Sequence, residues 1–473
     1  MTSPRDPIDD WLGADVTPLS PPPGSLARIR QRARRRKTRQ ATFAAAGCAV
    51  ILAAGVATPQ VISALRQPGH RNPPVAIGST APSVQPSSSR NTPKPEITKY
   101  TQLRQRTHLS TTTSKTLPPA NFRPTSVTFV GNGSGGVVGA VIGQAGPPCA
   151  TSVCTSLAGT SNYGQSWYGV SAPVAPGPSG SSGVSQLRFA NLRDGWAYGP
   201  ALYETSGGGW PWHHEDTHGQ RVIDVEAAPA RAFAVFGTCS GTDSNYPASC
   251  TSFSLWTSVP GTRTWTQVSV PAAYQQMQST SSAAPLLVIS RSTGYLLTPS
   301  GEVLSGPATH AGGPWSAVGM AKCKPASLAA AGQAAQSATQ LAAGPDLLLA
   351  CGTPTASGRF AAAIYTSANG AAWQSASSVT VKGTPMSLAS AGTGQMATAT
   401  VVLATAGGIK YSADGGRSWQ AARFTPAPAA GGFSYVGMTN ATQGVAVPAD
   451  PNLHEIYVTS DGGKTWQPSP ITG

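Results

Sequence analysis

The chain has 473 residues, of which only 11% are charged, while Gly and Pro together make up about a fifth. Average domains contain about 25% charged residues, and helices disfavour Gly and Pro. The composition therefore excludes a helical bundle, a coiled coil and a Rossmann-type enzyme, and it favours short strands and turns. The net charge of +14 is concentrated in residues 1–40 (+5) and 66–120 (+7), whereas residues 121–473 carry only +2. A nucleic-acid-binding surface is thus not predicted in the C-terminal region.

An uncharged, apolar segment follows the N-terminal basic run, and we interpret residues 1–40 as a cytoplasmic basic tail and residues 41–65 as a transmembrane helix. A bilayer core requires about 20 helical residues, and the run Arg28–Arg39 predicts a cytoplasmic N-terminus. A cleaved signal peptide is the alternative, with Gly55–Ala57 as its cleavage site. The long leader favours an uncleaved signal anchor, which places a single-pass protein in the cell membrane with its C-terminal region outside the cytoplasm.

Residues 66–120 are rich in Pro, Ser and Thr, contain few aliphatic residues and show no sustained hydrophobic period. Such a segment cannot bury enough apolar surface to offset its ordering entropy. We therefore expect a disordered stalk between the membrane and the C-terminal domain.

Six of the seven cysteines follow the apolar segment, and they occur in close sequential pairs. This spacing predicts three disulfides and an oxidising compartment. Metal ligation is the alternative, but the first two pairs lack C-x-x-C spacing. The expected pairs are Cys149–Cys154, Cys239–Cys250 and Cys323–Cys351.

A repeat occurs in the C-terminal region. The segments Ser412–Trp419 and Thr459–Trp466 both read Ser/Thr-x-Asp-Gly-Gly-x-Ser/Thr-Trp, and weaker copies end in five earlier tryptophans. The spacing of about 50 residues is typical of β-propeller blades, so seven markers predict seven blades. The markers are Trp167, Trp212, Trp265, Trp315, Trp373, Trp419 and Trp466.

The chemistry of this repeat is that of a tight hairpin. The Asp side chain accepts hydrogen bonds from its own turn, Gly adopts a positive φ, and Trp points between sheets as an apolar anchor. With four strands per repeat, the fold class predicted for residues 121–473 is all-β, a seven-bladed β-propeller. The structural residues of the two intact boxes are Asp414, Gly416, Trp419, Asp461, Gly463 and Trp466. Expected strands include 186–189, 195–198, 222–225, 339–342, 408–411 and 455–458.

These boxes resemble those of the Asp-box, or BNR-repeat, propellers, a group that includes sialidases, sortilin-type receptors, some glycoside hydrolases and photosystem assembly factors. The resemblance covers residues 122–473, although only two of the seven boxes are intact. It implies that Asp414 and Asp461 stabilise hairpins away from the ligand-binding face and are not catalytic.

The segment His214–His218 matches the zinc-protease motif H-E-x-x-H, which requires a helix so that both histidines face one metal ion. Pro211 and Gly219 flank the segment, and it contains no apolar residue that could bury a helix face. We therefore interpret it as a polar loop, with no metal and no cofactor. The weak metal candidates are His213, His214 and His218.

Signals for an enzyme are few. The segment Asn121–Pro124 faintly resembles the first-arginine motif of sialidases, but no feature assigns the other two arginines. No recognisable acid/base pair, nucleophile motif or dinucleotide fingerprint occurs. A glycoside hydrolase or sialidase-like enzyme is the alternative to a protein without catalytic activity.

The interpretation favoured by the sequence is a monomeric binding or scaffold module for an envelope protein or glycan, with no nucleic-acid partner. Loops that connect the second and third strands of a blade lie on the same face as loops that connect successive blades. We expect the ligand on that face, because disulfides would hold two of these loops. The predicted ligand-binding residues are His213, His214, Glu215, His218, Asp243 and Tyr246.

Overall fold

The computed structural model describes residues 117–131, 137–145, 155–176, 183–240, 247, 249–279, 283–325, 338–355, 358–392, 394–426 and 432–472. The predicted tail 1–40, the predicted transmembrane helix 41–65 and all but the last four residues of the predicted stalk lie outside these ranges. Cys149, Cys154, Asp243 and Tyr246 lie outside them as well. Among the described residues, no helix is both long and apolar enough to span a bilayer.

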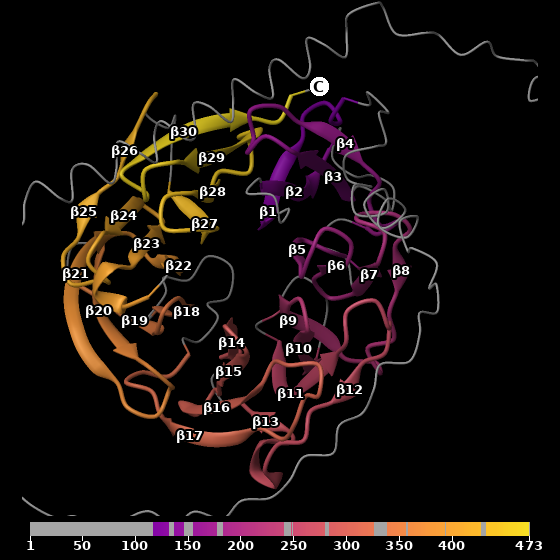
Figure 1. Ribbon diagram of the computed structural model, residues 1–473, viewed down its shortest axis with the longest axis vertical. Helices are drawn as coiled ribbons and strands as arrows, with labels where there is room; N and C mark the ends of the chain where they lie inside the picture. Colours follow the sequence, from indigo (N-terminus) through magenta and orange to yellow (C-terminus); the bar gives the residue numbers. More distant parts are fainter. Residues whose placement is uncertain are drawn as a thin grey trace, which may run out of the picture. The chain divides into compact units, whose positions relative to one another are not determined.

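The described residues form seven sheets arranged in a ring, antiparallel except for one short added edge strand, with the first strand of each blade nearest the central channel (Figure 1). The fold is an all-β, seven-bladed β-propeller, which confirms the predicted fold class and blade count. Blade 1 contains β1 (Arg123–Gly131), β2 (Val137–Gln144), β3 (Thr155–Thr160) and β4 (Tyr168–Val170). Blade 2 contains β5 (Gln186–Phe189), β6 (Gly195–Tyr198), β7 (Leu202–Thr205) and β8 (His213–His214). Blade 3 contains β9 (Arg221–Ala228), β10 (Arg231–Cys239), β11 (Cys250–Ser258), β12 (Thr266–Gln267) and β13 (Met277–Gln278).

The remaining four blades follow in chain order, and two short 3₁₀ helices, η2 (Ala272–Tyr274) and η3 (Met396–Thr398), lie in connections. Blade 4 contains β14 (Leu286–Ser290), β15 (Thr293–Leu297), β16 (Glu302–Pro307) and β17 (Ser316–Met320). Blade 5 contains β18 (Ala338–Ala343), β19 (Leu347–Pro354), β20 (Arg359–Ser367) and β21 (Gln374–Lys382). Blade 6 contains β22 (Pro385–Ala391), β23 (Thr400–Thr405), β24 (Gly408–Ser412) and β25 (Gln420–Ala421). Blade 7 contains β27 (Phe433–Met438), β28 (Gly444–Pro448), β29 (Glu455–Thr459) and β30 (Thr465–Pro470), with β26 (Arg423–Phe424) added at its outer edge.

The core of the described ring consists of seven apolar clusters, each at the boundary between two successive blades. In each cluster the marker tryptophan of one blade packs against the preceding blade. Trp265 of blade 3, for example, packs on Trp196 and Tyr198 of blade 2, and Trp315 of blade 4 packs on Phe233 of blade 3. The tryptophans therefore join the sheets, as the repeat motif predicted, because a sheet with two apolar faces must bury both.

Side-chain contacts close the ring between blades 1 and 7. Trp167 Nε1 donates to Ser469 Oγ at 2.9 Å, and the Tyr163 hydroxyl donates to the carbonyl of Gly444 at 2.8 Å. Trp167 also packs into an apolar cluster that contains Val445 and Ile456. Among the described strands, blades 1 and 7 exchange none with each other, so these contacts replace a shared sheet.

The two intact boxes form the hairpins that the motif predicted. Asp461 Oδ1 accepts hydrogen bonds from Thr459 Oγ1 and from the Thr465 backbone N–H, both at 2.9 Å, and Oδ2 accepts one from Thr465 Oγ1 at 2.6 Å. Gly463 has a φ of 82°, and its carbonyl accepts a hydrogen bond from Trp466 Nε1 at 3.0 Å. Partial burial alone would raise the pKa of the Asp461 carboxyl, but these hydrogen bonds lower it.

Blade 1 carries a natural variant of this turn, in which Asn162 takes the place of the aspartate. Its Oδ1 accepts a hydrogen bond from the Ser166 backbone N–H at 3.0 Å, and its Nδ2 donates to Ser166 Oγ at 2.8 Å. An amide therefore keeps the backbone hydrogen bond that a carboxylate accepts, and it keeps the contact with the hydroxyl with donor and acceptor exchanged.

We expect Asp461→Ala to lower the free energy of unfolding by about 1–3 kcal/mol, because it removes the acceptor of three hydrogen bonds. Asp461→Asn should cost much less, because Asn162 already performs this role in blade 1. Denaturant unfolding of both variants measures the difference. Equal losses for alanine and asparagine would contradict this account of the turn.

Candidate functional site

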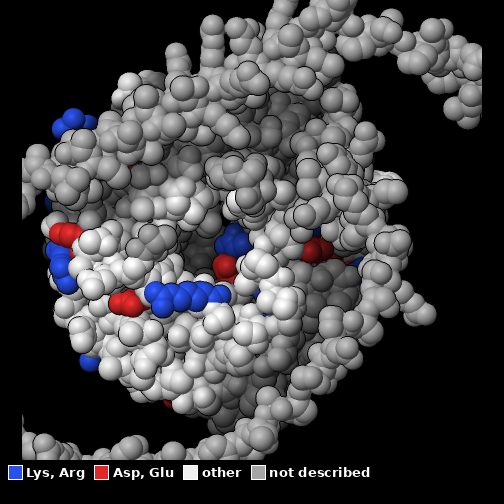
Figure 2. Space-filling model, in the orientation of Figure 1, with Lys and Arg blue, Asp and Glu red and all other residues white. Residues whose placement is uncertain are grey.

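The central channel contains a cavity of about 410 Å³, a volume within the usual range for small-ligand sites. The innermost strands of six blades line it, namely β5, β9, β14, β18, β22 and β27. Arg188, Asp224 and Glu226 are the charged residues of this lining. Figure 2 shows basic and acidic atoms together at the hollow in the middle of the ring.

Strand alternation places these three side chains on the channel side. In β5, Leu187 and Phe189 are buried in the core, so Arg188 between them points the opposite way. In β9, Asp224 and Glu226 lie on either side of buried Val225 and share one face of the strand. β5 and β9 belong to neighbouring blades, which brings the guanidinium and the carboxylates together.

The charged groups form a connected cluster across the two blades. Arg188 Nε donates to Glu226 Oε1 at 3.2 Å, and Arg188 Nη1 donates to the Leu187 carbonyl at 3.0 Å. The guanidinium carbon lies 5.6 Å from the ring centre of Tyr435, which is a cation–π distance. Asp224 Oδ1 accepts a hydrogen bond from the Tyr198 hydroxyl at 3.3 Å.

Burial and the neighbouring Glu226 carboxylate raise the pKa of Asp224 to about 7, although Arg188 and the Tyr198 hydrogen bond act in the opposite direction. Burial alone would lower the pKa of Arg188, but the surrounding Tyr198, Glu226, Tyr435 and Asp224 raise it above its ordinary value. Arg188 therefore stays charged, whereas Asp224 exchanges a proton near neutral pH.

The predicted loop residues occupy different environments. His213 and His214 form β8, the outermost strand of blade 2, and the His214 ring lies edge-on to Tyr203 at 5.0 Å between centres. Glu215 is only 4% exposed, and its Oε1 accepts a hydrogen bond from Arg263 Nε at 3.0 Å. It points to blade 3 and not to solvent, which differs from the polar loop expected around it.

Glu215 belongs to a junction between blades 2 and 3 that contains a second buried carboxylate, Glu204. Glu204 accepts hydrogen bonds from Trp196 Nε1 at 3.0 Å and from the Gly261 backbone N–H at 3.1 Å. In the blade 3 turn, Pro260 stands where intact boxes have aspartate, so Glu204 supplies a carboxylate from the neighbouring blade. Burial raises the pKa of Glu204 to about 7, and the Glu215 charge adds to this effect. Both glutamates therefore link blades 2 and 3 through hydrogen bonds.

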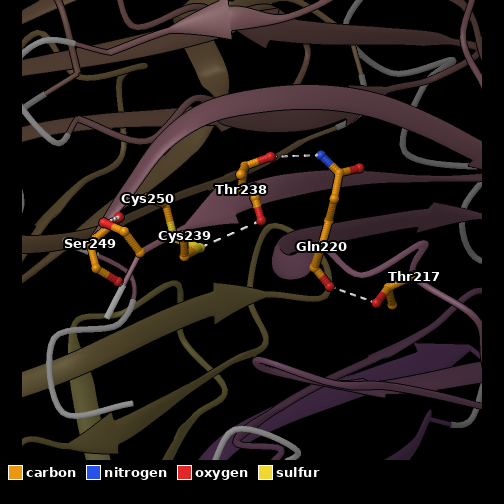
Figure 3. The surroundings of a disulfide bond; sticks show 8 residues. Thr217, Gln220, Thr238, Cys239, Ser249 and Cys250 are labelled. Atoms are coloured by element: carbon orange, nitrogen blue, oxygen red, sulfur yellow. Dashed lines mark hydrogen bonds between the residues drawn. A yellow bond between two sulfur atoms is a disulfide. The ribbon is translucent and has the colours of Figure 1, made fainter. Parts of the chain in front are cut away.

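His218 lies on the loop between blades 2 and 3, and its ring stacks on Trp256 at 4.7 Å between centres. Next to it, Gln220 Nε2 donates to Thr238 Oγ1 at 3.3 Å, close to the disulfide between Cys239 and Cys250 (Figure 3). The loop after blade 2 thus contacts the end of β10, next to this disulfide. The structure also pairs Cys323 with Cys351, and this bond joins the segment after β17 to β19.

Within the described ranges, no three His, Cys, Asp or Glu side chains lie close enough together to hold a metal ion. The two histidines of the H-E-x-x-H segment lie on a strand and on a loop, and Glu215 between them is engaged by Arg263. The arrangement that zinc hydrolysis requires is therefore not formed by this segment.

The channel cluster was not among the site residues predicted from the sequence, although residues 186–189 and 222–225 were expected to form strands. Alternation about Leu187, Phe189 and Val225 places Arg188, Asp224 and Glu226 away from the core. Val222 is also buried, because an irregularity between Val222 and Asp224 shifts the register of β9. In a chain with few charges, three charged residues on innermost strands were the sequence feature that could have indicated this site.

No protein-family model matches the sequence, and no curated protein matches it. Among solved structures, YCF48 from Cyanidioschyzon merolae is similar with a TM-score of 0.38 and 14% identity, over 61% of this chain and 85% of that chain. Sqt1 of Saccharomyces cerevisiae has a TM-score of 0.41 and 11% identity, over 73% and 85% of the two chains. An ancestral GH74 enzyme has a TM-score of 0.30 and 11% identity, over 72% and 56%. At these values the neighbours assign neither a function nor a site residue to this chain.

Proposed function

We propose that this chain is a binding module whose ligand enters the central channel. The observation that carries the proposal is the cavity of about 410 Å³, because it coincides with the connected cluster of Arg188, Asp224 and Glu226. Charged groups taken partly out of water reduce stability unless they are paired. A cluster of three in a chain with so few charges therefore favours a binding role.

We expect Gln340→Trp to abolish binding, because Gln340 lines the cavity and an indole would fill it. Gln374→Trp is the matched control, since Gln374 is exposed on the outermost strand of blade 5. The full-length protein in detergent is tested on a glycan array and on an array of envelope-protein peptides. A ligand of the wild type that is lost in Gln340→Trp and kept in Gln374→Trp supports the channel. Binding that survives Gln340→Trp contradicts it and favours the loop face around His218.

The alternative, a glycoside hydrolase or sialidase-like enzyme, is tested with the same variants. Turnover of a fluorogenic glycoside by the wild type that disappears in Gln340→Trp would replace the binding module by an enzyme.

The proposal includes the cellular setting predicted from the sequence, a module anchored by residues 41–65 whose partner is an envelope protein or glycan. A C-terminal alkaline phosphatase fusion is expected to be active, because the basic run before the apolar segment orients the chain. A fluorescent C-terminal GFP fusion, which folds in the cytoplasm, would contradict this orientation.

The turn geometry at Asp414 and Asp461 supports the further proposal that the domain is related to the Asp-box propellers.

A further inference from the structure

We propose that the channel binds an organic cation, an ammonium or guanidinium group, with Asp224 as its counter-ion. This inference rests on the proposed function of the channel and adds the chemical class of its ligand.

The balance of charge in the lining carries the proposal. Arg188 donates from Nε to Glu226 and lies against the Tyr435 ring, so its charge is already partnered. Asp224 has a neutral phenol, Tyr198, as its hydrogen-bond partner at 3.3 Å. Two carboxylates therefore face one guanidinium, and the ionised lining carries one negative charge in excess. An entering cation neutralises this charge, whereas an anion would add to it.

The rest of the described lining suits a cation that carries a carbon chain. Met386 and Met438 supply thioether and methylene surface, and Gln340 and Ser434 supply neutral polar groups. Met386 is 40% exposed, which is high for a large apolar side chain, and it belongs to the cavity lining. A cavity of about 410 Å³ is larger than an ammonium group needs, so it also accommodates the attached chain.

Proton exchange at Asp224 makes the affinity for a cation depend on pH. In the free protein, burial and Glu226 raise the pKa of Asp224, so a fraction of the carboxyl groups is protonated at neutral pH. A bound cation stabilises the ionised form, so binding releases a proton and affinity rises with pH. The charged and titratable side chains that act on Asp224 are Glu226 on its own strand, Arg188 on β5 and Tyr198 on β6. Tyr435 on β27 lines the same cavity and lies against Arg188. The lining from β14, β18 and β22 contributes no charged residue.

Isothermal titration calorimetry of the full-length protein tests the proposal with three probes: Nα-acetyl-lysinamide, an eight-residue peptide with a central lysine, and the same peptide with norleucine at that position. We expect at least one lysine probe to bind, and the norleucine peptide to bind at least about tenfold more weakly. Asp224→Asn should weaken the lysine probe by about tenfold or more and remove the rise in affinity between about pH 6 and pH 8. Asp216→Asn makes the same charge change at an exposed position and should leave the affinity unchanged.

Each outcome decides one point. If the free lysine amide binds as tightly as the peptide, the ligand is a small cation. If the peptide alone binds, the cation is a side chain of a protein partner. Equal affinity for the lysine and norleucine peptides, no binding of either lysine probe, or an unchanged affinity in Asp224→Asn overturns the inference. A neutral or anionic ligand that Gln340→Trp excludes would also overturn it while leaving the channel as the binding site.

Discussion

Arg188→Met should lower the free energy of unfolding by about 3–5 kcal/mol at about pH 8, because it leaves Glu226 and Asp224 beside each other without their cation. The Arg188 side chain is 18% exposed, so solvent screens the cluster only in part. The guanidinium also bridges β5 and β9, and its loss weakens the contact between blades 2 and 3.

The loss of unfolding free energy caused by Arg188→Met should be smaller at about pH 5 than at about pH 8. Without Arg188, which lowers the pKa of Asp224, that pKa in the folded protein rises further above its value in the unfolded chain. A group whose pKa is raised on folding stabilises the fold when it is protonated. This stabilisation decreases as the pH rises from the group's pKa in the unfolded chain to its pKa in the folded protein. The variant therefore loses more stability than the wild type as pH rises from 5 to 8.

Denaturant unfolding at the two pH values measures this difference, and Arg417→Met is the matched control because Arg417 is exposed in the blade 6 turn. The double variant Arg188→Met/Glu226→Gln should recover part of the loss, since it removes one of the two unpaired carboxylates. A loss in Arg188→Met that equals that of Arg417→Met at both pH values would show that the cluster does not stabilise the ring.

Trp466→Ala should lower the free energy of unfolding by about 3–5 kcal/mol, the usual range for removing a fully buried large aromatic side chain. Trp466 is 0% exposed and belongs to the cluster between blades 6 and 7, which also contains Tyr457 and Val402. Its loss leaves a cavity at this boundary and removes the hydrogen bond from Nε1 to the Gly463 carbonyl.

Trp210→Ala provides the comparison for Trp466→Ala. Trp210 is 70% exposed at the β7–β8 turn, so its removal should change stability by no more than about 0.5 kcal/mol. Thermal unfolding followed by circular dichroism measures both variants. Similar losses for Trp466 and Trp210 would contradict the role assigned to the marker tryptophans.

The sequence alone predicted the features that depend on residues close together in the chain. The Asp461 turn depends on hydrogen bonds between residues at most four positions apart, so its motif predicts its geometry. Blade number followed from the tryptophan spacing because each blade places its marker tryptophan in the same kind of contact with the preceding blade. The strands predicted at 339–342 and 408–411 appear as β18 and β24 for the same reason.

Contacts between residues far apart in the chain could not be predicted from the sequence, because they form only when the blades close into a ring. Glu215 lies in a motif that suggests a zinc protease, yet its partner Arg263 is 48 residues away on the next blade. Trp167 meets Ser469 across 302 residues, and no local pattern specifies that pair. Strand alternation determines that Arg188 and Glu226 point out of the core, but only the packing of β5 beside β9 brings opposite charges together around a cavity. The sequence thus determined the blade, because its turns and strand faces are local, whereas the tertiary structure determined the candidate site, because that site exists only where several blades meet.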